Sequence, residues 1–153
     1  MTTTPKPHNP KRRSRTRKSA KNAGARFERE IADYLAQHVD DRIDRRVRTG
    51  AKDTGDIGGV RVHGQRIVVE CKNTSRVNLA GWAAEAEVER VNDGALAGIV
   101  VHKRHGRGDP ADQWVTLTVL DLIALLTGTR PADAPAARLV GRESDENPPR
   151  VTE

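Results

Sequence analysis

The segment DIGGVRVHGQRIVVECK, residues 56–72, decides the fold of this 153-residue chain. Residues 57–62 and 66–71 are rich in β-branched side chains, and the His63-Gly64 pair between them is typical of a tight turn. The sequence therefore predicts a β-hairpin, whose second strand ends in Glu70-Cys71-Lys72.

The two faces of this hairpin carry different side chains. Alternate residues of a strand share a face, so Glu70 and Lys72 point to one side and Cys71 to the other. In a regular hairpin with a two-residue turn, Asp56 would stand opposite Cys71 and face away from Glu70. A three-residue loop, or a bulge at Gly58-Gly59, would return Asp56 to the face of Glu70. We expect one of these two irregularities.

The rest of the chain shows alternating helical and strand patterns. Apolar residues at helical spacing, among them Phe27 and Ile31, predict a helix from residue 22 to about residue 39. Residues 42–49 are expected to form a charged edge strand. The later elements are a helix over 79–92 stopped by Gly94, strands over 97–102 and 114–119, and a helix over 120–127 ended by Gly128.

This order predicts an α/β fold with a mixed central β-sheet flanked by helices. We expect one domain over residues 22–128, between a disordered basic arm at 1–21 and a flexible Pro/Ala-rich tail at 129–153. Trp82 and Trp114 are expected in core or edge packing rather than as base-stacking platforms.

Charge and cysteine content narrow the class of protein. The net charge is +6, but residues 1–29 hold ten Lys and Arg against one Glu, so the remaining residues are net acidic. Such a basic arm is suited to phosphate backbones, although a nuclear address is an alternative. The single cysteine, Cys71, excludes an intrachain disulfide, and no apolar run approaches a membrane span. We expect a cytoplasmic protein of a bacterium, or of a phage in its host, without a membrane partner.

The acids and the lysine of the hairpin suggest phosphodiester hydrolysis. Such a reaction needs an activated water and neutralisation of phosphate charge, which a divalent cation supplies. Mg²⁺, with Mn²⁺ as a substitute, prefers oxygen ligands, and Asp56, Glu70 and the backbone carbonyl of Cys71 are our candidates. Lys72 would orient the water or stabilise phosphate charge. The alternatives are an ordinary Glu70–Lys72 ion pair and a turn-forming Asp56.

The opening helix offers two further acids. Glu28 lies about 70° from the centre of the apolar stripe and Glu30 about 90° from it on the other flank, by the 100° step of a helix. Glu28 is slightly better placed to face the site, but geometry alone leaves both open, and a solvated Glu28 is an alternative.

These residues resemble a known family. Residues 24–30, GARFERE, resemble the opening helix of archaeal-type Holliday junction resolvases, in the PD-(D/E)xK nuclease superfamily. Arg48-Thr49-Gly50 is similar to that family's loop before the metal-binding Asp, and Glu70-Cys71-Lys72 to its E-x-K. The resemblance favours Glu28 as a catalytic residue and possible metal ligand beside Asp56, Glu70 and Lys72. It implies a restriction-endonuclease-like fold and a homodimer that cuts four-way DNA junctions with Mg²⁺.

The chain departs from the family in two respects, since Gly55 replaces a frequent proline and the basic arm is long. The alternative functions are a restriction- or repair-type nuclease of the same fold and a non-catalytic DNA-binding protein. The candidate DNA-binding residues share a positive charge: Arg48, Arg29, Lys52, Arg12, Arg13, Arg15, Arg17 and Lys18.

Overall fold

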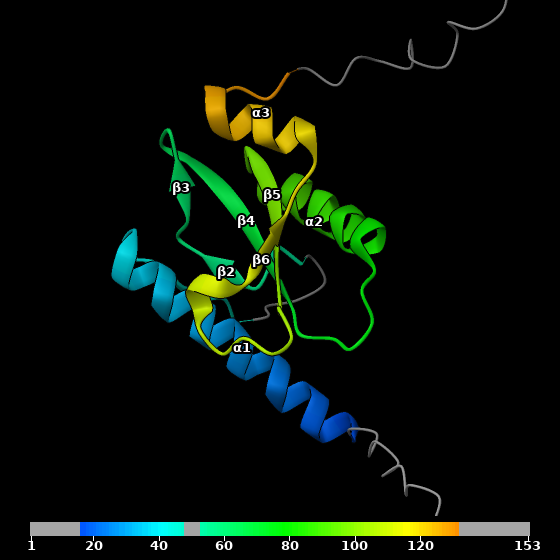
Figure 1. Ribbon diagram of the computed structural model, residues 1–153. Helices are drawn as coiled ribbons and strands as arrows, with labels where there is room; N and C mark the ends of the chain where they lie inside the picture. Colours follow the sequence, from blue (N-terminus) through cyan, green and yellow to red (C-terminus); the bar gives the residue numbers. More distant parts are fainter. Residues whose placement is uncertain (1–15, 48–52, 132–153) are drawn as a thin grey trace, which may run out of the picture.

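The computed structural model describes residues 16–47 and 53–131 of the chain (Figure 1). The described helices are α1 (Arg17–His38), α2 (Leu79–Asp93), the short 3₁₀ helix η1 (Pro110–Asp112) and α3 (Val119–Thr127). The described strands are β1 (Asp44–Arg45), β2 (Ile57–Gly58), β3 (Arg61–Val62), β4 (Gln65–Lys72), β5 (Ala97–His102) and β6 (Trp114–Thr116). The predicted mixed α/β fold is confirmed.

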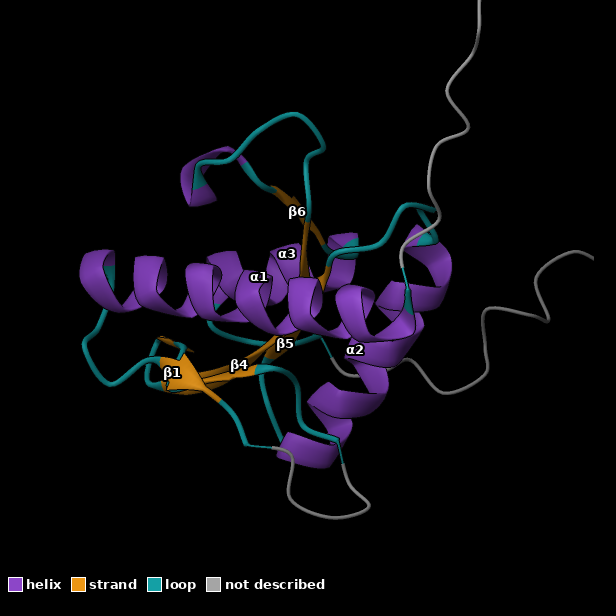
Figure 2. Ribbon diagram, turned by 90° about the horizontal axis from the view of Figure 1, so that it is seen from below, coloured by secondary structure: helices purple, strands orange, loops and turns teal. Residues whose placement is uncertain are grey.

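The strands form one mixed sheet in the order β1-β2-β4-β5-β6, with β3 paired to β4. β4 and β5 are parallel, whereas β2 and β3 pair antiparallel with β4, and β6 with β5. Helices α1 and α3 cover one face of the sheet, and α2 covers the other (Figure 2). The sheet is therefore the middle layer of the domain.

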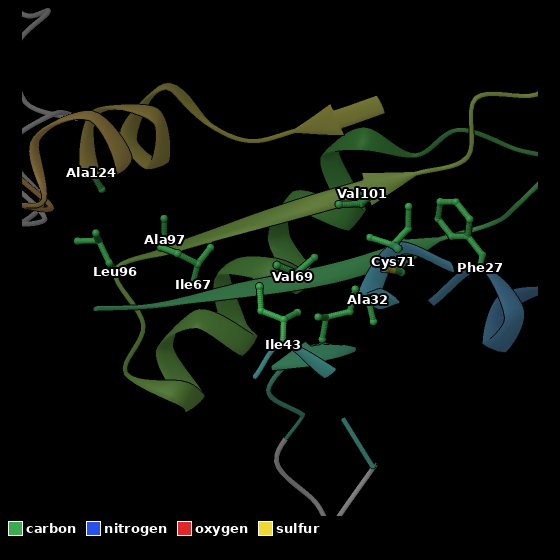
Figure 3. Close-up of a cluster of buried hydrophobic side chains, with 12 residues drawn as sticks. Phe27, Ala32, Ile43, Ile67, Val69, Cys71, Leu96, Ala97, Val101 and Ala124 are labelled. Carbon is green, nitrogen blue, oxygen red and sulfur yellow. The ribbon is translucent and has the colours of Figure 1, made fainter. Parts of the chain in front are cut away.

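The main core lies between the sheet and α1 with α3. Phe27 and Ile31 of α1 pack there with Ile67, Val69 and Cys71 of β4 (Figure 3). On the other face, Trp82 and Ala86 of α2 pack on Val100 of β5. Because side chains alternate along β4, Glu70 and Lys72 point to the layer of α2. The prediction that Glu70 and Lys72 share one face of the sheet and Cys71 lies on the other is thus confirmed.

The hairpin contains the predicted bulge. His63 and Gly64 form a two-residue turn with positive φ at both positions, 52° and 75°, so the alternative of a three-residue loop is not the one adopted. Ile67 N–H donates to the Val60 carbonyl at 3.0 Å, and Ile57 pairs with Val69. Two residues, Gly58 and Gly59, therefore oppose the single Val68, which defines a β-bulge.

The bulge changes the partner of Asp56. Since Ile57 pairs with Val69, the preceding Asp56 stands beside Glu70 instead of Cys71. Gly59 makes this register possible, because its φ is 84° and an added Cβ would lie 2.5 Å from the Arg42 carbonyl oxygen. Glycine is thus required at position 59 for both backbone conformation and space.

Helix α1 begins at Arg17, five residues before the predicted start at residue 22. The Thr16 side chain accepts a hydrogen bond from Ser19 N–H at 3.2 Å and caps the helix. Residues 17–21 were predicted to be disordered because they are polar, but Arg, Lys and Ala are also good helix formers. The predicted disorder of the whole arm is therefore wrong for its last five residues.

Other boundaries follow the predicted pattern with smaller changes. Helix α2 ends at Asp93 and is capped by Gly94, whose φ of 58° is left-handed, and β5 has the predicted bounds. The predicted strand over 42–49 is reduced to the two residues of β1 within the described part of the chain. Strand β6 stops at Thr116, because Thr118 caps α3 through a hydrogen bond from Asp121 N–H. None of the helices described here has the length and apolar character needed to cross a membrane.

Replacement of Gly59 tests the role of the bulge. We expect Gly59→Ala to lower the free energy of unfolding by roughly 2 to 4 kcal/mol, from the unfavourable positive φ together with the clash at Arg42. Gly64→Ala is the matched control, since its φ is also positive but no atom lies within 4 Å of an added Cβ. Its loss should stay at about 1 to 2 kcal/mol. Urea denaturation measures both, and equal losses would contradict the assigned clash.

Candidate functional site

The candidate site lies at the end of β4, on the sheet face that α2 covers. Glu70 is only 4% exposed, and its Oε1 accepts a hydrogen bond from Lys72 Nζ at 2.8 Å. The same ammonium group also contacts Glu85 of α2. Most of the Glu70–Lys72 pair is withdrawn from solvent, so it differs from the exposed surface ion pair that was the alternative.

Asp56 is fixed beside this pair through the backbone of β4. Its Oδ2 accepts a hydrogen bond from Cys71 N–H at 2.9 Å, and its own N–H donates to the Val69 carbonyl at 3.0 Å. Asp56 is buried, as is Glu70. The structure thus brings together three of the predicted site residues, Asp56, Glu70 and Lys72.

Helix α2 adds acids that the sequence analysis did not select. Glu89 is 6% exposed and meets Glu70, and Glu85 lies one turn earlier on the same helix. A signal was present in the sequence, because Trp82, Ala86 and Glu89 follow the i, i+4, i+7 spacing of a buried helix stripe. A glutamate on such a stripe indicates a buried acid. The site opens into a cavity of about 540 Å³ lined by Asp53, Glu70, Lys72, Ala84, Glu85, Val88 and Glu89.

Burial and mutual repulsion change the ionisation of these acids. Burial first, and then repulsion from Asp56, raise the pKa of Glu70 to about 8, although Lys72 opposes the shift. Burial first, and then repulsion from Asp53, raise the pKa of Glu89 to about 7. Burial alone would lower the pKa of Lys72, but hydrogen bonds to Glu70 and Glu85 raise it above its usual value. Full ionisation of these acids would therefore give the site more negative charge than the Lys72 ammonium compensates.

The donor set fits a hard divalent cation at Asp56 and Glu70. Both are carboxylates, and Glu70 Oε2 is buried without a hydrogen-bond partner. Across residues 16–47 and 53–131, no group of three or more His, Cys, Asp or Glu side chains has the geometry to hold a metal ion. Mg²⁺ commonly uses one or two carboxylates and keeps several waters, so a pair is enough. The carbonyl of Cys71 as a third ligand stays a prediction.

Glu28 occupies a different position. It lies on α1, which covers the opposite face of the sheet, and its Oε2 accepts a hydrogen bond from Arg45 Nε at 2.6 Å. Its charge is close enough to Cys71 to contribute to the raised pKa of that thiol, of which burial is the main cause. The structure thus gives Glu28 an arginine partner, and its predicted catalytic role stays a prediction.

The predicted DNA-binding residues fall into three groups. Arg17 and Lys18 are exposed on the first turn of α1. Arg29 instead bridges to Asp33 at 3.3 Å and to Asp44 at 2.6 Å, which ties α1 to β1. The others, Arg12, Arg13, Arg15, Arg48 and Lys52, lie outside the described residues.

Further cations lie at the same end of the sheet as Lys72. Asn73 donates to the Ala23 carbonyl at 3.1 Å, which joins the first half of α1 to the end of β4. Lys103 follows β5, and its N–H donates to the Lys72 carbonyl at 2.9 Å. Next to it, Arg104 stacks over the ring of Trp114 at 4.5 Å. Trp114 is 51% exposed on the edge strand β6, whereas Trp82 of α2 is buried against Val100 of β5.

Comparison of the chain with models of protein families, with curated proteins and with solved structures finds no match in any of the three.

The pH dependence of stability tests the burial of Glu70 and Glu89. Both pKa values are raised above the unfolded value of about 4.5, so these groups favour the folded state at low pH and this contribution is lost as pH rises. In EDTA, the free energy of unfolding should fall between about pH 5 and 8, with a slope of at most about 1.4 kcal/mol per pH unit for each group. Glu70→Gln should flatten this slope. Glu30→Gln, the loss of a half-buried acid of α1 that pairs with Arg26, should leave it unchanged, and a flat wild-type profile would contradict the assignment.

Proposed function

We propose that the protein is a Mg²⁺-dependent DNA endonuclease with a restriction-endonuclease-like fold, and that it acts as a homodimer on four-way junctions. The observation that carries the proposal is the buried Glu70, which contacts Lys72 and stands beside Asp56 at the end of β4. A bound cation would polarise the phosphate and lower the pKa of a bound water. Asp56 and Glu70 would hold it, because a cation between them would offset the repulsion from Asp56 that helps to raise the pKa of Glu70.

Lys72 has a restricted chemical role in this proposal. Because Glu70 and Glu85 raise its pKa above the ordinary value, the ammonium stays protonated at neutral pH. It can donate hydrogen bonds to a water or to a phosphate oxygen, but it cannot accept a proton. We infer that Lys72 stabilises charge and orders the nucleophile, and that it is not the general base.

The distribution of cations supports DNA as the substrate. Arg17 and Lys18 on α1, and Lys103 and Arg104 after β5, are on elements joined to the end of β4 that carries Lys72. Cations at this end of the sheet can hold the phosphate backbone without reading sequence. The preference for four-way junctions and the homodimer rest on the resemblance of residues 24–30 and 48–50 to the resolvases. The single cysteine favours a reducing compartment, the cytoplasm of a bacterium or of a phage's host.

Removal of a metal-ligand charge is the direct test of the proposed activity. Asp56→Asn and Glu70→Gln should each abolish Mg²⁺-dependent cleavage of a labelled four-way junction while junction binding persists, because the cations that hold DNA are untouched. Cleavage and binding are measured on junction and duplex DNA, with Mg²⁺ and with EDTA. Glu30→Gln is the control and should cut like the wild type.

The outcomes separate the alternatives. Equal cutting of junction and duplex would favour a restriction- or repair-type nuclease. DNA binding without any cleavage by the wild type would indicate a non-catalytic DNA-binding protein. Near wild-type cutting by either Asp56→Asn or Glu70→Gln would remove the proposed centre.

Lys72→Ala tests the charge-stabilising role. We expect turnover to fall about 100-fold or more, the scale seen when a group that stabilises transition-state charge is removed. Junction affinity should change little, since other cations hold the backbone. Single-turnover rates and binding titrations distinguish these effects, and Lys103→Ala is the control for loss of one positive charge nearby. A loss of affinity with an unchanged rate at saturation would make Lys72 a phosphate contact only.

A further inference from the structure

The contact between α2 and β4 contains two carboxyl groups with unmet oxygens. Glu70 Oε2 and Glu89 Oε2 are both buried, no N–H or hydroxyl group of the described residues donates to either of them, and the two carboxyl groups meet each other. The two residues are 4% and 6% exposed, come from different elements and line the same cavity. Buried polar groups normally have partners, and an exception calls for an explanation such as an ion.

The Lys72 ammonium does not donate a hydrogen bond to Glu70 Oε2. Lys72 Nζ already bonds to Glu70 Oε1 and to Glu85, so the second oxygen of Glu70 is left over. On the opposite face of the sheet, Glu28 has Arg45 as its partner at 2.6 Å. Of these two candidate helix acids, Glu89 is therefore the one left with an unmet oxygen.

We propose that Glu89 is a cation ligand, and that Glu70 and Glu89 together hold a divalent cation between β4 and α2. Glu70 is then the ligand common to two pairs of acids. Asp56 stands beside it in the sheet, and Glu89 approaches it from α2. Two carboxylates with waters satisfy Mg²⁺ or Mn²⁺, so no third side chain is needed. This inference rests on the proposed metal centre, because both use Glu70 as a ligand.

The packing of α2 on the sheet fixes the position of Glu89. Trp82 and Ala86 lie on the same stripe of the helix and pack on Val100, which is the register neighbour of Glu70 in β5. Glu89 therefore lies on a helix that packs directly on β5, the strand next to Glu70. A ligand held in this way keeps its position without depending on a loop.

Titration of the full-length protein with Mn²⁺ in the absence of DNA tests the inference. Isothermal titration calorimetry and electron paramagnetic resonance of free Mn²⁺ report binding independently of cleavage. We expect Glu89→Gln to weaken Mn²⁺ binding at least tenfold while the circular dichroism spectrum is preserved. Glu89→Asp should recover part of the affinity, because it keeps the charge on a shorter side chain. Glu87→Gln, the same change two residues away on α2, should bind like the wild type, since Glu87 pairs with Arg90 and Arg130.

Each outcome decides between the inference and the proposed function. Wild-type affinity of Glu89→Gln for Mn²⁺ overturns the inference. If Asp56→Asn loses Mn²⁺ binding in the same experiment, the proposed metal centre at Asp56 and Glu70 is still supported. Tenfold weaker binding in both Glu89→Gln and Glu87→Gln also overturns it, because the effect would then be a general change of charge. Glu89-dependent binding in a protein that cuts no DNA supports the cation site and removes the nuclease function. Absence of Mn²⁺ binding by the wild type overturns both.

Discussion

The candidate site depends on one irregularity in the backbone, the bulge at Gly58-Gly59. A regular ladder from the His63-Gly64 turn would put Asp56 opposite Cys71, on the α1 side of the sheet, where apolar side chains pack. The extra residue shifts the register by one and moves Asp56 beside Glu70. Without this shift the two carboxylates would be separated by the sheet, so the proposed cation would lose one of its ligands.

Helix α2 then adds two further acids next to this pair. Glu85 and Glu89 approach Glu70 from the helix, and Lys72 is the near ammonium among them. Desolvation raises the pKa of both Glu70 and Glu89, so the buried acids reduce stability as they ionise. Such an arrangement is typical of functional sites, where stability is lost in exchange for binding a charged ligand.

The sequence predicted the parts of this site that follow from a strand's period of two. The face shared by Glu70 and Lys72, and the need for a bulge to recruit Asp56, both came from counting residues along the hairpin. Glu89 was not predicted, because the period of the strands carries no information on the buried helix stripe to which Glu89 belongs. The start of α1 was also missed, since polar composition hides the cap at Thr16. Glu28 could not be settled by geometry, because a side chain about 70° from the stripe centre can turn either way.

The roles of Lys72 and the acids are linked by a shared hydrogen bond. In this structure the Lys72 ammonium donates to Glu70 and Glu85, which leaves one of its three donor positions for a water or a phosphate oxygen. A move of the ammonium away from Glu70 would be favourable only if the charge of Glu70 were compensated in another way, because an unpaired buried carboxylate is costly. The proposed cation at Glu70 would therefore free Lys72 to act fully on the phosphate. Glu85, which is exposed and bonds only to Lys72 among its described contacts, would then keep the ammonium near the site.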